Sequence, residues 1–208
     1  MSINDTRRLM ISRREAIAPS VQKIAAQQLA DHIIQLSIYQ RSQHIAVYWA
    51  MGGEISLHPL IEHAWEQNKQ CYLPVVHRQS MTFIPYFKNT IVRKNRFGIP
   101  EPVNDENAIP ATELDLVLTP LVAFDRYCHR IGMGGGYYDR TFAFLKEQKN
   151  CLALPLNRDS ERPSVANPYL MGVAHECQQA DSIEPEPWDV TLNSICTSIG
   201  QVGIDQSN

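Results

Sequence analysis

The densest group of residues able to do chemistry runs from Arg130 to Asp139 and reads Arg-Ile-Gly-Met-Gly-Gly-Gly-Tyr-Tyr-Asp. Glycines let a backbone approach a ligand closely, and successive N–H groups of such a loop converge on anions such as phosphate. Arg130 can donate two hydrogen bonds to a phosphate, and Asp139 can hold Mg²⁺ against phosphate oxygens. The segment therefore predicts a site for nucleotide phosphates.

General nucleotide-binding motifs do not fit this segment. A P-loop requires Lys-Ser or Lys-Thr after its last glycine, and the chain contains neither dipeptide. The dinucleotide pattern G-x-G-x-x-G fails because Tyr137 stands where its last glycine should be. Taken alone, a glycine-rich loop is as typical of a close strand–helix junction as of a ligand site.

A longer pattern is more specific. Arg-x-Gly-x-Gly-x-Gly-Tyr-Tyr-Asp, preceded by Thr-Pro-Leu-Val-Ala-Phe-Asp, closely resembles the hallmark of the 5-formyltetrahydrofolate cyclo-ligase family. Supporting segments follow in the family's order: an N-terminal Arg-rich helix, Val-Tyr-Trp-Ala-Met-Gly-Gly-Glu-Ile, Gly-Ile-Pro-Glu-Pro and Gly-Val-Ala-His-Glu-Cys. The resemblance implies a three-layer α/β/α, Rossmann-like fold. It also implies ATP-dependent closure of 5-formyltetrahydrofolate to 5,10-methenyltetrahydrofolate, with ATP as co-substrate and Mg²⁺ as the metal.

The resemblance also implies roles for individual residues. The expected catalytic residues are Arg130, Tyr138 and Glu54. The expected ATP-binding residues are Arg7, Arg8, Arg13, Arg130, Gly132, Met133, Gly134, Gly135, Gly136, Tyr137 and Asp139. The expected folate-binding residues are Met51, Glu54, Phe97 and Tyr138, and the expected magnesium ligands are Asp139 and Asp189.

The chain departs from the family pattern at three places. Ile3 stands where many members have a lysine, Met133 and Gly135 stand where some have cations, and residues 151–168 form a longer stretch than usual. Two other interpretations therefore stay open. One is a non-catalytic folate- or nucleotide-binding protein on the same fold, and the other is a dehydrogenase that uses the glycine loop for NAD.

The remaining sequence predicts the elements that position these residues. We expect helices from an Asp5 cap through Arg14, from Pro19 to about residue 37, over 58–68 and over 137–148. We expect strands at 45–49, 71–73, 81–85, 114–118, 151–156, 170–174 and 195–198, with Pro74 ending the second. Residues 88–112 and 157–168 are expected to be loops.

Strands that alternate with helices predict an α/β fold with a largely parallel central sheet. Ligands in such sheets bind outside the carboxyl ends of the strands. The two strand-to-loop junctions with chemistry after them are 49–54 and 118–136, and we expect these segments to meet.

The composition limits the class of protein. The 208 residues carry a net charge of -3, so no overall charge draws the chain to nucleic acid or an anionic membrane. The five cysteines are widely spaced without a C-x-x-C pair, which indicates reduced thiols rather than disulfides or structural zinc. We expect a single cytoplasmic domain over 1–208, with Arg-bearing helices over 5–37. We expect it to act as a monomer on small molecules, without nucleic acid or membrane partners.

Overall fold

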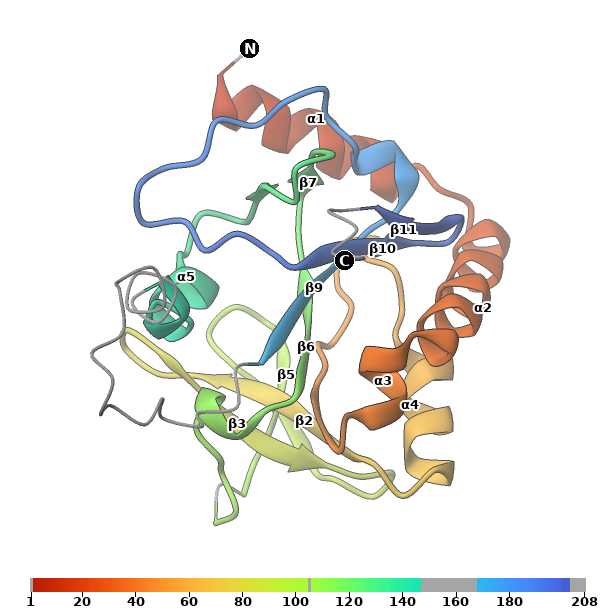
Figure 1. Ribbon diagram of the computed structural model, residues 1–208, viewed down its shortest axis with the longest axis vertical. Coiled ribbons are helices and arrows are strands. Elements are labelled where there is room, and N and C mark those ends of the chain that lie inside the picture. Colours follow the sequence, from red (N-terminus) through yellow and green to blue (C-terminus); the bar gives the residue numbers. More distant parts are fainter. Residues whose placement is uncertain (1, 105, 147–167, 203–208) are drawn as a thin grey trace, which may run out of the picture.

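Helices and strands alternate along residues 2–104, 106–146 and 168–202, which are the residues described by the computed structural model (Figure 1). The helical elements are α1 (Ile3–Glu15), α2 (Pro19–Gln35), α3 (Ser37–Arg41), α4 (His58–Glu66), η1 (Ala111–Glu113), α5 (Tyr137–Thr141) and η2 (Glu176–Gln178). The strands are β1 (His44–Ala46), β2 (Gln70–Val76), β3 (Met81–Tyr86), β4 (Val92–Lys94), β5 (Pro100–Pro102), β6 (Leu116–Pro120), β7 (Ala123–Phe124), β8 (Arg130–Ile131), β9 (Tyr169–Val173), β10 (Ser194–Thr197) and β11 (Gly200–Val202).

Seven of the described strands form one sheet in the order β11-β10-β9-β6-β1-β2-β3. Its inner strands are parallel, and only the edge strands β3 and β11 run antiparallel to their neighbours. The chain builds outward from β1 to β2 and β3, and in the other direction from β6 to β9 and β10. The strand order therefore reverses between β1 and β6, which is where open α/β sheets bind ligands. The expected largely parallel, Rossmann-like α/β fold is confirmed.

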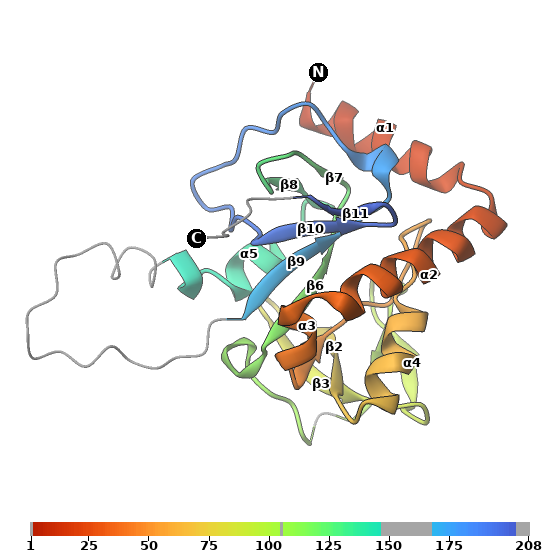
Figure 2. The ribbon, with the colours of Figure 1, turned by 45° about the vertical axis from the view of Figure 1, so that its right-hand side comes forward.

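The central strand β6 shows why both faces of the sheet are covered. Successive side chains alternate between faces, so Leu116 and Leu118 pack in one core cluster and Val117 packs in another. All three are fully buried. Helices α2, α3 and α4 cover the first face, and α5 lies over the second (Figures 1 and 2). Burial on both faces explains the continuous apolar sequence of this strand.

Helix α1 lies across the end of the sheet where β6 runs into β7 (Figure 1). Its Met10 is buried in a third apolar cluster with Val122 and Ala123, and with Ile131 of the β7–β8 hairpin. The helix is thereby held over the carboxyl ends of the parallel strands. This placement brings its arginines to the edge where the two junction loops emerge.

Two predicted helix and strand limits are wrong. Asp5 is not the cap of α1: Ser2 is the N-cap, its hydroxyl accepts from the Asp5 N–H, and the Asp5 side chain accepts from the Ser2 N–H in return. Pro74 does not end the second strand, because β2 continues to Val76 beside β3. The pairing of β2 with β1 ends at Tyr72. Pro74 therefore lies where no hydrogen bond to β1 is needed, and its lack of an N–H group costs no pairing.

Other expectations hold in part. The segment 88–112 is not simply a loop, because it contains the β4–β5 hairpin and η1. The helix expected over 137–148 is interrupted: α5 ends at Thr141, a turn follows at 142–143, and residues 144–146 are helical again. Residues 147–167 lie outside the described residues, together with the strand expected at 151–156 and nearly all of the loop expected at 157–168. Helix α3 and strand β11 were not expected from the sequence. The strands predicted at 81–85, 170–174 and 195–198 are confirmed within one residue as β3, β9 and β10.

Two cysteines lie inside the sheet on opposite sides of the order reversal. Cys71 in β2 and Cys196 in β10 are 1% and 0% exposed. Burial raises the pKa of each thiol to about 12. Both side chains are therefore protonated at neutral pH and pack as small apolar groups. Among the helices that the structure describes, none has the length and apolar character needed to cross a bilayer.

Candidate functional site

The β7–β8 hairpin that precedes the glycine loop is held by a fully buried carboxylate. Asp125 accepts through Oδ1 from the N–H groups of Tyr127 and His129, at 2.9 and 3.0 Å. Its Oδ2 accepts from the Ile183 N–H at 2.9 Å and lies 3.0 Å from Nδ1 of His129. A buried carboxylate requires such donors, and here they fix the turn that aims Arg130.

Arg130, on β8, is held against the start of α5. Its Nη2 donates to Oδ1 of Asp139 at 2.5 Å, and its Nη1 donates to the carbonyl of Val190. Only 7% of the Arg130 side-chain surface is exposed, against 21% for Asp139. The Val190 N–H also donates to Oδ1 of Asp139 at 3.1 Å. The predicted pair of a phosphate-binding arginine and an acid is therefore brought together as a charge-assisted contact.

Two glycines of the loop adopt a backbone conformation that favours glycine. Gly134 and Gly136 have φ of 93° and 63°, in the left-handed region that favours glycine. Arg7 of α1 reaches across the sheet edge, and its Nε donates to the carbonyl of Gly132 at 2.8 Å. The guanidinium of Arg7 also lies beside Gly134, where a Cβ would sit 3.7 Å away from it. Met133 points outward and is 68% exposed.

The other two predicted α1 arginines lie elsewhere. Arg8 is 81% exposed in its side chain and forms an ion pair with Asp5 at 3.7 Å. Arg13 is exposed and donates to the Met10 sulfur at 3.8 Å. Neither contacts the glycine loop in the described structure. Residues i and i+1, or i and i+6, face different directions on a helix, so α1 presents only Arg7 of this set to the loop.

The second junction loop is a tight turn after β1. Gly52 and Gly53 have φ of 52° and 75°, and Oε2 of Glu54 accepts from the Met51 N–H at 3.0 Å. Burial raises the pKa of Glu54, while the Met51 N–H and the charge of Arg14 oppose that rise. Met51 itself is 39% exposed. The turn thus presents one partly buried carboxylate beside an exposed apolar side chain.

The aromatic residues at the start of α5 join the two loops. Burial raises the pKa of Tyr138, and the charge of Glu54 raises it further while Arg130 lowers it. The hydroxyl of Tyr138 therefore lies in the field of both predicted catalytic charges. Tyr137 accepts a hydrogen bond from Nη2 of Arg96 at 2.6 Å and contacts Phe97 edge-on at a ring distance of 6.1 Å. Phe97, which the sequence placed near the folate, is 52% exposed at the β4–β5 turn.

The two predicted metal ligands, Asp139 and Asp189, are linked through the backbone N–H of Val190. Asp139 accepts from the Val190 N–H, and Asp189 is the preceding residue. Asp189 uses its Oδ2 to accept from the Glu186 N–H at 2.9 Å, which closes a local turn. The described residues contain no group of three or more His, Cys, Asp or Glu side chains placed to hold a metal.

Sequence reasoning missed two arginines at this edge. Arg14 is 3% exposed and contacts the 51–54 turn, and Arg96 links the β4–β5 hairpin to Tyr137. A signal for Arg14 was present in the sequence. Arg7, Met10 and Arg14 are spaced by three and four residues, which places all three on one helix face, and Met10 marks that face as the buried one.

The comparison that decides the family spans both loops. A model of the 5-formyltetrahydrofolate cyclo-ligase family matches residues 2–198 of this chain, which include α1, the 51–54 turn and the whole glycine loop. The chain belongs to the 5-formyltetrahydrofolate cyclo-ligase family. It is therefore an enzyme of that family, and the dehydrogenase and the non-catalytic binding protein left open by the glycine loop are not supported.

Individual cyclo-ligases are similar over most of their length. The 5-formyltetrahydrofolate cyclo-ligase of Haemophilus influenzae is 36% identical over 198 residues, which cover 88% of this chain and 96% of that protein. The Escherichia coli K12 enzyme of the same name is 34% identical over 189 residues, which cover 89% of this chain and 94% of that protein.

Solved structures agree on the cyclo-ligase fold. The 5,10-methenyltetrahydrofolate synthetase of Aquifex aeolicus superposes with a TM-score of 0.79 at 22% identity, covering 100% of this chain and 95% of that one. The Mycoplasma pneumoniae synthetase superposes with a TM-score of 0.68 at 21% identity, covering 95% of this chain and 99% of that one. At these identities the likeness concerns the fold.

Proposed function

We propose that this chain closes 5-formyltetrahydrofolate to 5,10-methenyltetrahydrofolate with ATP as co-substrate, at the sheet edge between β1 and β6. The observation that carries the proposal is that the loops after β1 and β6 emerge at the same sheet edge, where Arg14 contacts both, in a chain of the cyclo-ligase family. The glycine loop brings Arg130 and contacts Arg7, and the turn after β1 brings Glu54. One loop suits phosphates and the other suits the polar groups of a folate.

The chemistry explains why phosphate must be handled beside folate. A formamide is a poor electrophile because its nitrogen lone pair is delocalised into the carbonyl. Transfer of the γ-phosphoryl group to the formyl oxygen forms a P–O bond, breaks the bond to the β-phosphate oxygen and releases ADP. The N10 amine then attacks the activated carbon and loses its proton, and the C–O bond breaks to release phosphate. Such a transfer depends on positioning and on cations around the phosphates more than on covalent help from the protein.

In this proposal the glycine loop and two arginines hold the nucleotide. Arg130 is fixed on both sides by Asp139 and Val190, so its guanidinium is oriented before ATP arrives. Arg7 is fixed on the Gly132 carbonyl and reaches the same loop from α1. Arg8 and Arg13 make no contact with the loop, and their proposed part is limited to positive charge on α1.

The folate is proposed to lie against the 51–54 turn. The Glu54 carboxylate accepts pterin N–H groups or influences the N10 proton. Met51 and Phe97 are exposed apolar groups that can cover a pterin ring, and both lie at loops beside the site. The charges of Glu54 and Arg130 both act on the pKa of Tyr138, and we assign its hydroxyl to the boundary between the two substrates.

Magnesium is part of the same proposal. In the described part of the chain, Oδ2 of Asp139 has no hydrogen-bond partner, since both of its donors bind Oδ1. Magnesium takes one or two carboxylates together with phosphate oxygens and water, so this oxygen fits, and Asp189 is the second carboxylate of the proposal. Bound Mg²⁺ would neutralise phosphate charge during transfer.

The test is the absorbance rise of methenyltetrahydrofolate on mixing the purified chain with 5-formyltetrahydrofolate, ATP and Mg²⁺, with each omitted in turn. We expect a rise that needs 5-formyltetrahydrofolate and ATP and is abolished by a magnesium chelator. ADP formed in step with the product supports the ligase. A folded protein that binds both ligands without a rise would contradict the proposal and favour the non-catalytic alternative.

The wider setting belongs to this proposal as well. We propose that residues 1–208 act as one domain, as a monomer in the cytoplasm, on small-molecule substrates and without nucleic acid or membrane partners. Size-exclusion chromatography with light scattering at assay concentration tests the monomer. Cell fractionation with an activity assay on each fraction tests the compartment.

A further inference from the structure

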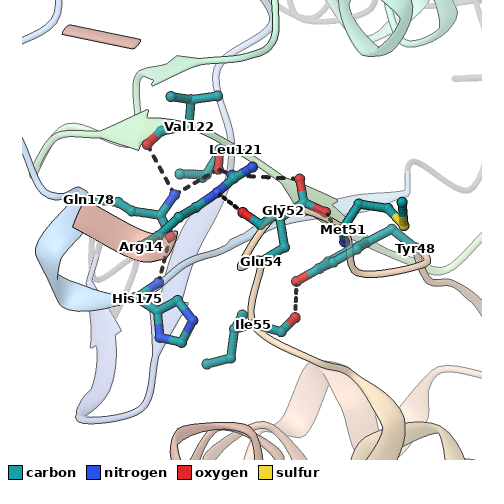
Figure 3. Close-up of polar contacts among 10 residues, drawn as sticks. All are labelled: Arg14, Tyr48, Met51, Gly52, Glu54, Ile55, Leu121, Val122, His175 and Gln178. Atoms are coloured by element: carbon teal, nitrogen blue, oxygen red, sulfur yellow. Dashed lines mark hydrogen bonds and ion pairs between the residues drawn. The ribbon is translucent and has the colours of Figure 1, made fainter. Parts of the chain in front are cut away.

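Arg14, at the end of α1, is a buried arginine with partners on two loops of the sheet edge. Only 4% of the Arg14 side-chain surface is exposed. Its Nε donates to the Gly52 carbonyl at 2.8 Å, and its Nη1 donates to the Leu121 carbonyl at 3.4 Å and lies 3.6 Å from Oε1 of Glu54. Figure 3 shows this side chain between the 51–54 turn and the loop after β6. One guanidinium therefore joins α1 to the loops that follow both β1 and β6.

A second side chain fixes the carbonyls that Arg14 uses. Gln178 of η2 donates through Nε2 to the carbonyls of Leu121 and Val122, at 2.8 and 3.0 Å (Figure 3). The amide oxygen of Gln178 accepts from the His175 N–H at 2.9 Å. The Leu121 carbonyl thus receives both Arg14 and Gln178. Because its surroundings are held, the guanidinium has one orientation available, and that orientation faces Glu54.

The Glu54 carboxylate depends on few groups for its position. Its Oε2 accepts from the Met51 N–H, and its Oε1 faces Arg14. The nearby Tyr48 hydroxyl is directed away, because it donates to the Ile55 carbonyl at 2.6 Å (Figure 3). A carboxylate that is 15% exposed is costly unless a charge or hydrogen bonds compensate it. Arg14 is the cation that the structure places against it.

The turn itself is also built on α1. A Cβ on Gly53 would meet the Arg14 carbonyl oxygen at 3.0 Å and the Glu15 Cα at 3.1 Å. The backbone of the turn therefore touches the helix end that carries Arg14. Main-chain contact and side-chain contact act on the same four residues, 51–54.

We propose that Arg14 is a positioning residue for the cyclo-ligase reaction, which holds the Glu54 carboxylate and the 51–54 turn in the orientation that receives the folate. The inference rests on the proposed function, because it assigns Glu54 to the folate. Arg14 acts through Glu54 and does not touch either substrate. Its effect is therefore specific to 5-formyltetrahydrofolate, whereas ATP is held by Arg7 and Arg130 on the neighbouring loop.

The experiment is a double-mutant cycle on the full chain with Arg14→Gln, Glu54→Gln and the double variant. We expect Arg14→Gln to raise the KM for 5-formyltetrahydrofolate about tenfold, in the range that follows loss of a buried charge contact, with the KM for ATP within about twofold of wild type. In the Glu54→Gln background, Arg14→Gln should change the folate KM by less than about threefold. Arg14→Lys should restore part of the loss, because it keeps the charge without the planar fork.

The controls separate positioning from folding. Arg41→Gln in α3 is a matched change of an exposed arginine and should leave all constants unchanged. If Arg14→Gln alone does not fold, Arg14→Lys and the double variant carry the test, since the first keeps the buried charge and the second leaves no charge unpaired. Equal rises in both KM values, or losses that multiply in the double variant, would overturn the proposal.

The cycle is also run on equilibrium binding of 5-formyltetrahydrofolate by calorimetry. If the wild-type protein shows no turnover, the proposed reaction is wrong. The binding cycle would still show whether Arg14 acts through Glu54. Independent, multiplicative losses in binding would reject the positioning role even where turnover is present.

Discussion

The two carboxylate oxygens of Asp139 differ in their hydrogen-bond partners. Oδ1 accepts from Arg130 and from the Val190 N–H, which ties the start of α5 to the β8 strand and to the segment after η2. Oδ2 has no hydrogen-bond partner among the described residues. An asparagine keeps an acceptor at the first position and removes the negative charge at both, so it weakens the contact with Arg130 as well as any contact with a metal.

We expect Asp139→Asn to lower turnover about tenfold or more and to raise the Mg²⁺ concentration needed for half-maximal rate. The loss of a charged contact to a metal or to Arg130 is worth about 1.5–3 kcal/mol, and each 1.36 kcal/mol is a factor of ten in rate. A magnesium titration of the initial rate, with circular dichroism for the fold, measures this. Asp181→Asn, an exposed acid, is the control. Wild-type rates and magnesium dependence in Asp139→Asn would remove Asp139 from the metal site.

Among individual residues, the sequence predicted those that belong to a contiguous motif. The glycines, Arg130 and Asp139 form a contiguous motif, so their meeting was predictable. Arg14 contacts Gly52, which is 38 residues away along the chain, and Leu121, which is 107 residues away. The helical spacing of Arg7, Met10 and Arg14 marks the buried face of α1, but it does not show which distant residues Arg14 contacts. The same holds for Arg96, whose partner Tyr137 is 41 residues away.

The 51–54 turn is an element whose shape depends on two conditions at once. Gly53 needs a positive φ of 75°, and it needs no side chain because the end of α1 lies 3.0 Å from where a Cβ would be. Gly98, in the β4–β5 turn, has a similar φ of 77° with nothing within 4 Å of a Cβ. Substitution of Gly98 tests backbone strain alone, whereas substitution of Gly53 tests backbone strain together with close contact.

We expect Gly53→Ala to lower the free energy of unfolding by about 2–4 kcal/mol, and Gly98→Ala by about 1–2 kcal/mol. Left-handed backbone costs an alanine about 1–2 kcal/mol, and forced overlap with packed backbone adds about 1–3 kcal/mol. Urea unfolding of both variants beside wild type gives the two values. Equal losses would mean that α1 yields to the extra methyl group and does not press on the turn.

The limits of the elements were less predictable than their existence. Strand β2 passes through Pro74 because only β3 pairs with it at that point, which is a fact about neighbours rather than about proline. Asp5 was a reasonable cap on its own, yet Ser2 three residues earlier forms a reciprocal pair with it. The β4–β5 hairpin has three-residue strands, which are too short to show an alternating pattern.

For the whole molecule, alternation of strands and helices was enough to predict a largely parallel sheet. It was not enough to predict that β3 and β11 turn back at the edges, because direction depends on which strand each one meets. The reaction itself required the resemblance to the cyclo-ligases. The glycine-rich loop by itself predicted phosphate binding only. Neither Glu54 nor Met51 by itself predicted a folate substrate.

The stability of the whole fold should depend on pH through a buried histidine. Burial lowers the pKa of His175, whose side chain accepts from the Gln178 N–H and is 2% exposed. In the unfolded chain a histidine binds a proton below about pH 6.5, whereas His175 in the fold does so only at lower pH. The unfolded state then binds more protons, so stability is present above pH 6.5 and is lost as the pH falls toward the lowered value.

We expect the free energy of unfolding to fall between pH 6.5 and 5, by up to about 1.4 kcal/mol per pH unit from this one group. His175→Gln should reduce that slope, whatever it does to stability at neutral pH. The raised pKa of Glu54 changes stability with pH in the opposite direction. The quantity to measure is therefore the difference in pH slope between the wild-type protein and His175→Gln. Denaturant titrations at four pH values supply it, and identical slopes would contradict the assignment.

The alkylation rates of the two thiols inside the sheet can report how the native sheet opens. Cys71 and Cys196 sit on opposite sides of the order reversal, and neither reacts while covered and protonated. Alkylation under native conditions therefore measures how often each half of the sheet opens. With peptide mass spectrometry to follow both sites, equal rates mean that the sheet opens as one cooperative unit. A faster Cys196 would mean that the β9–β11 side separates first, while β1 and β2 remain paired.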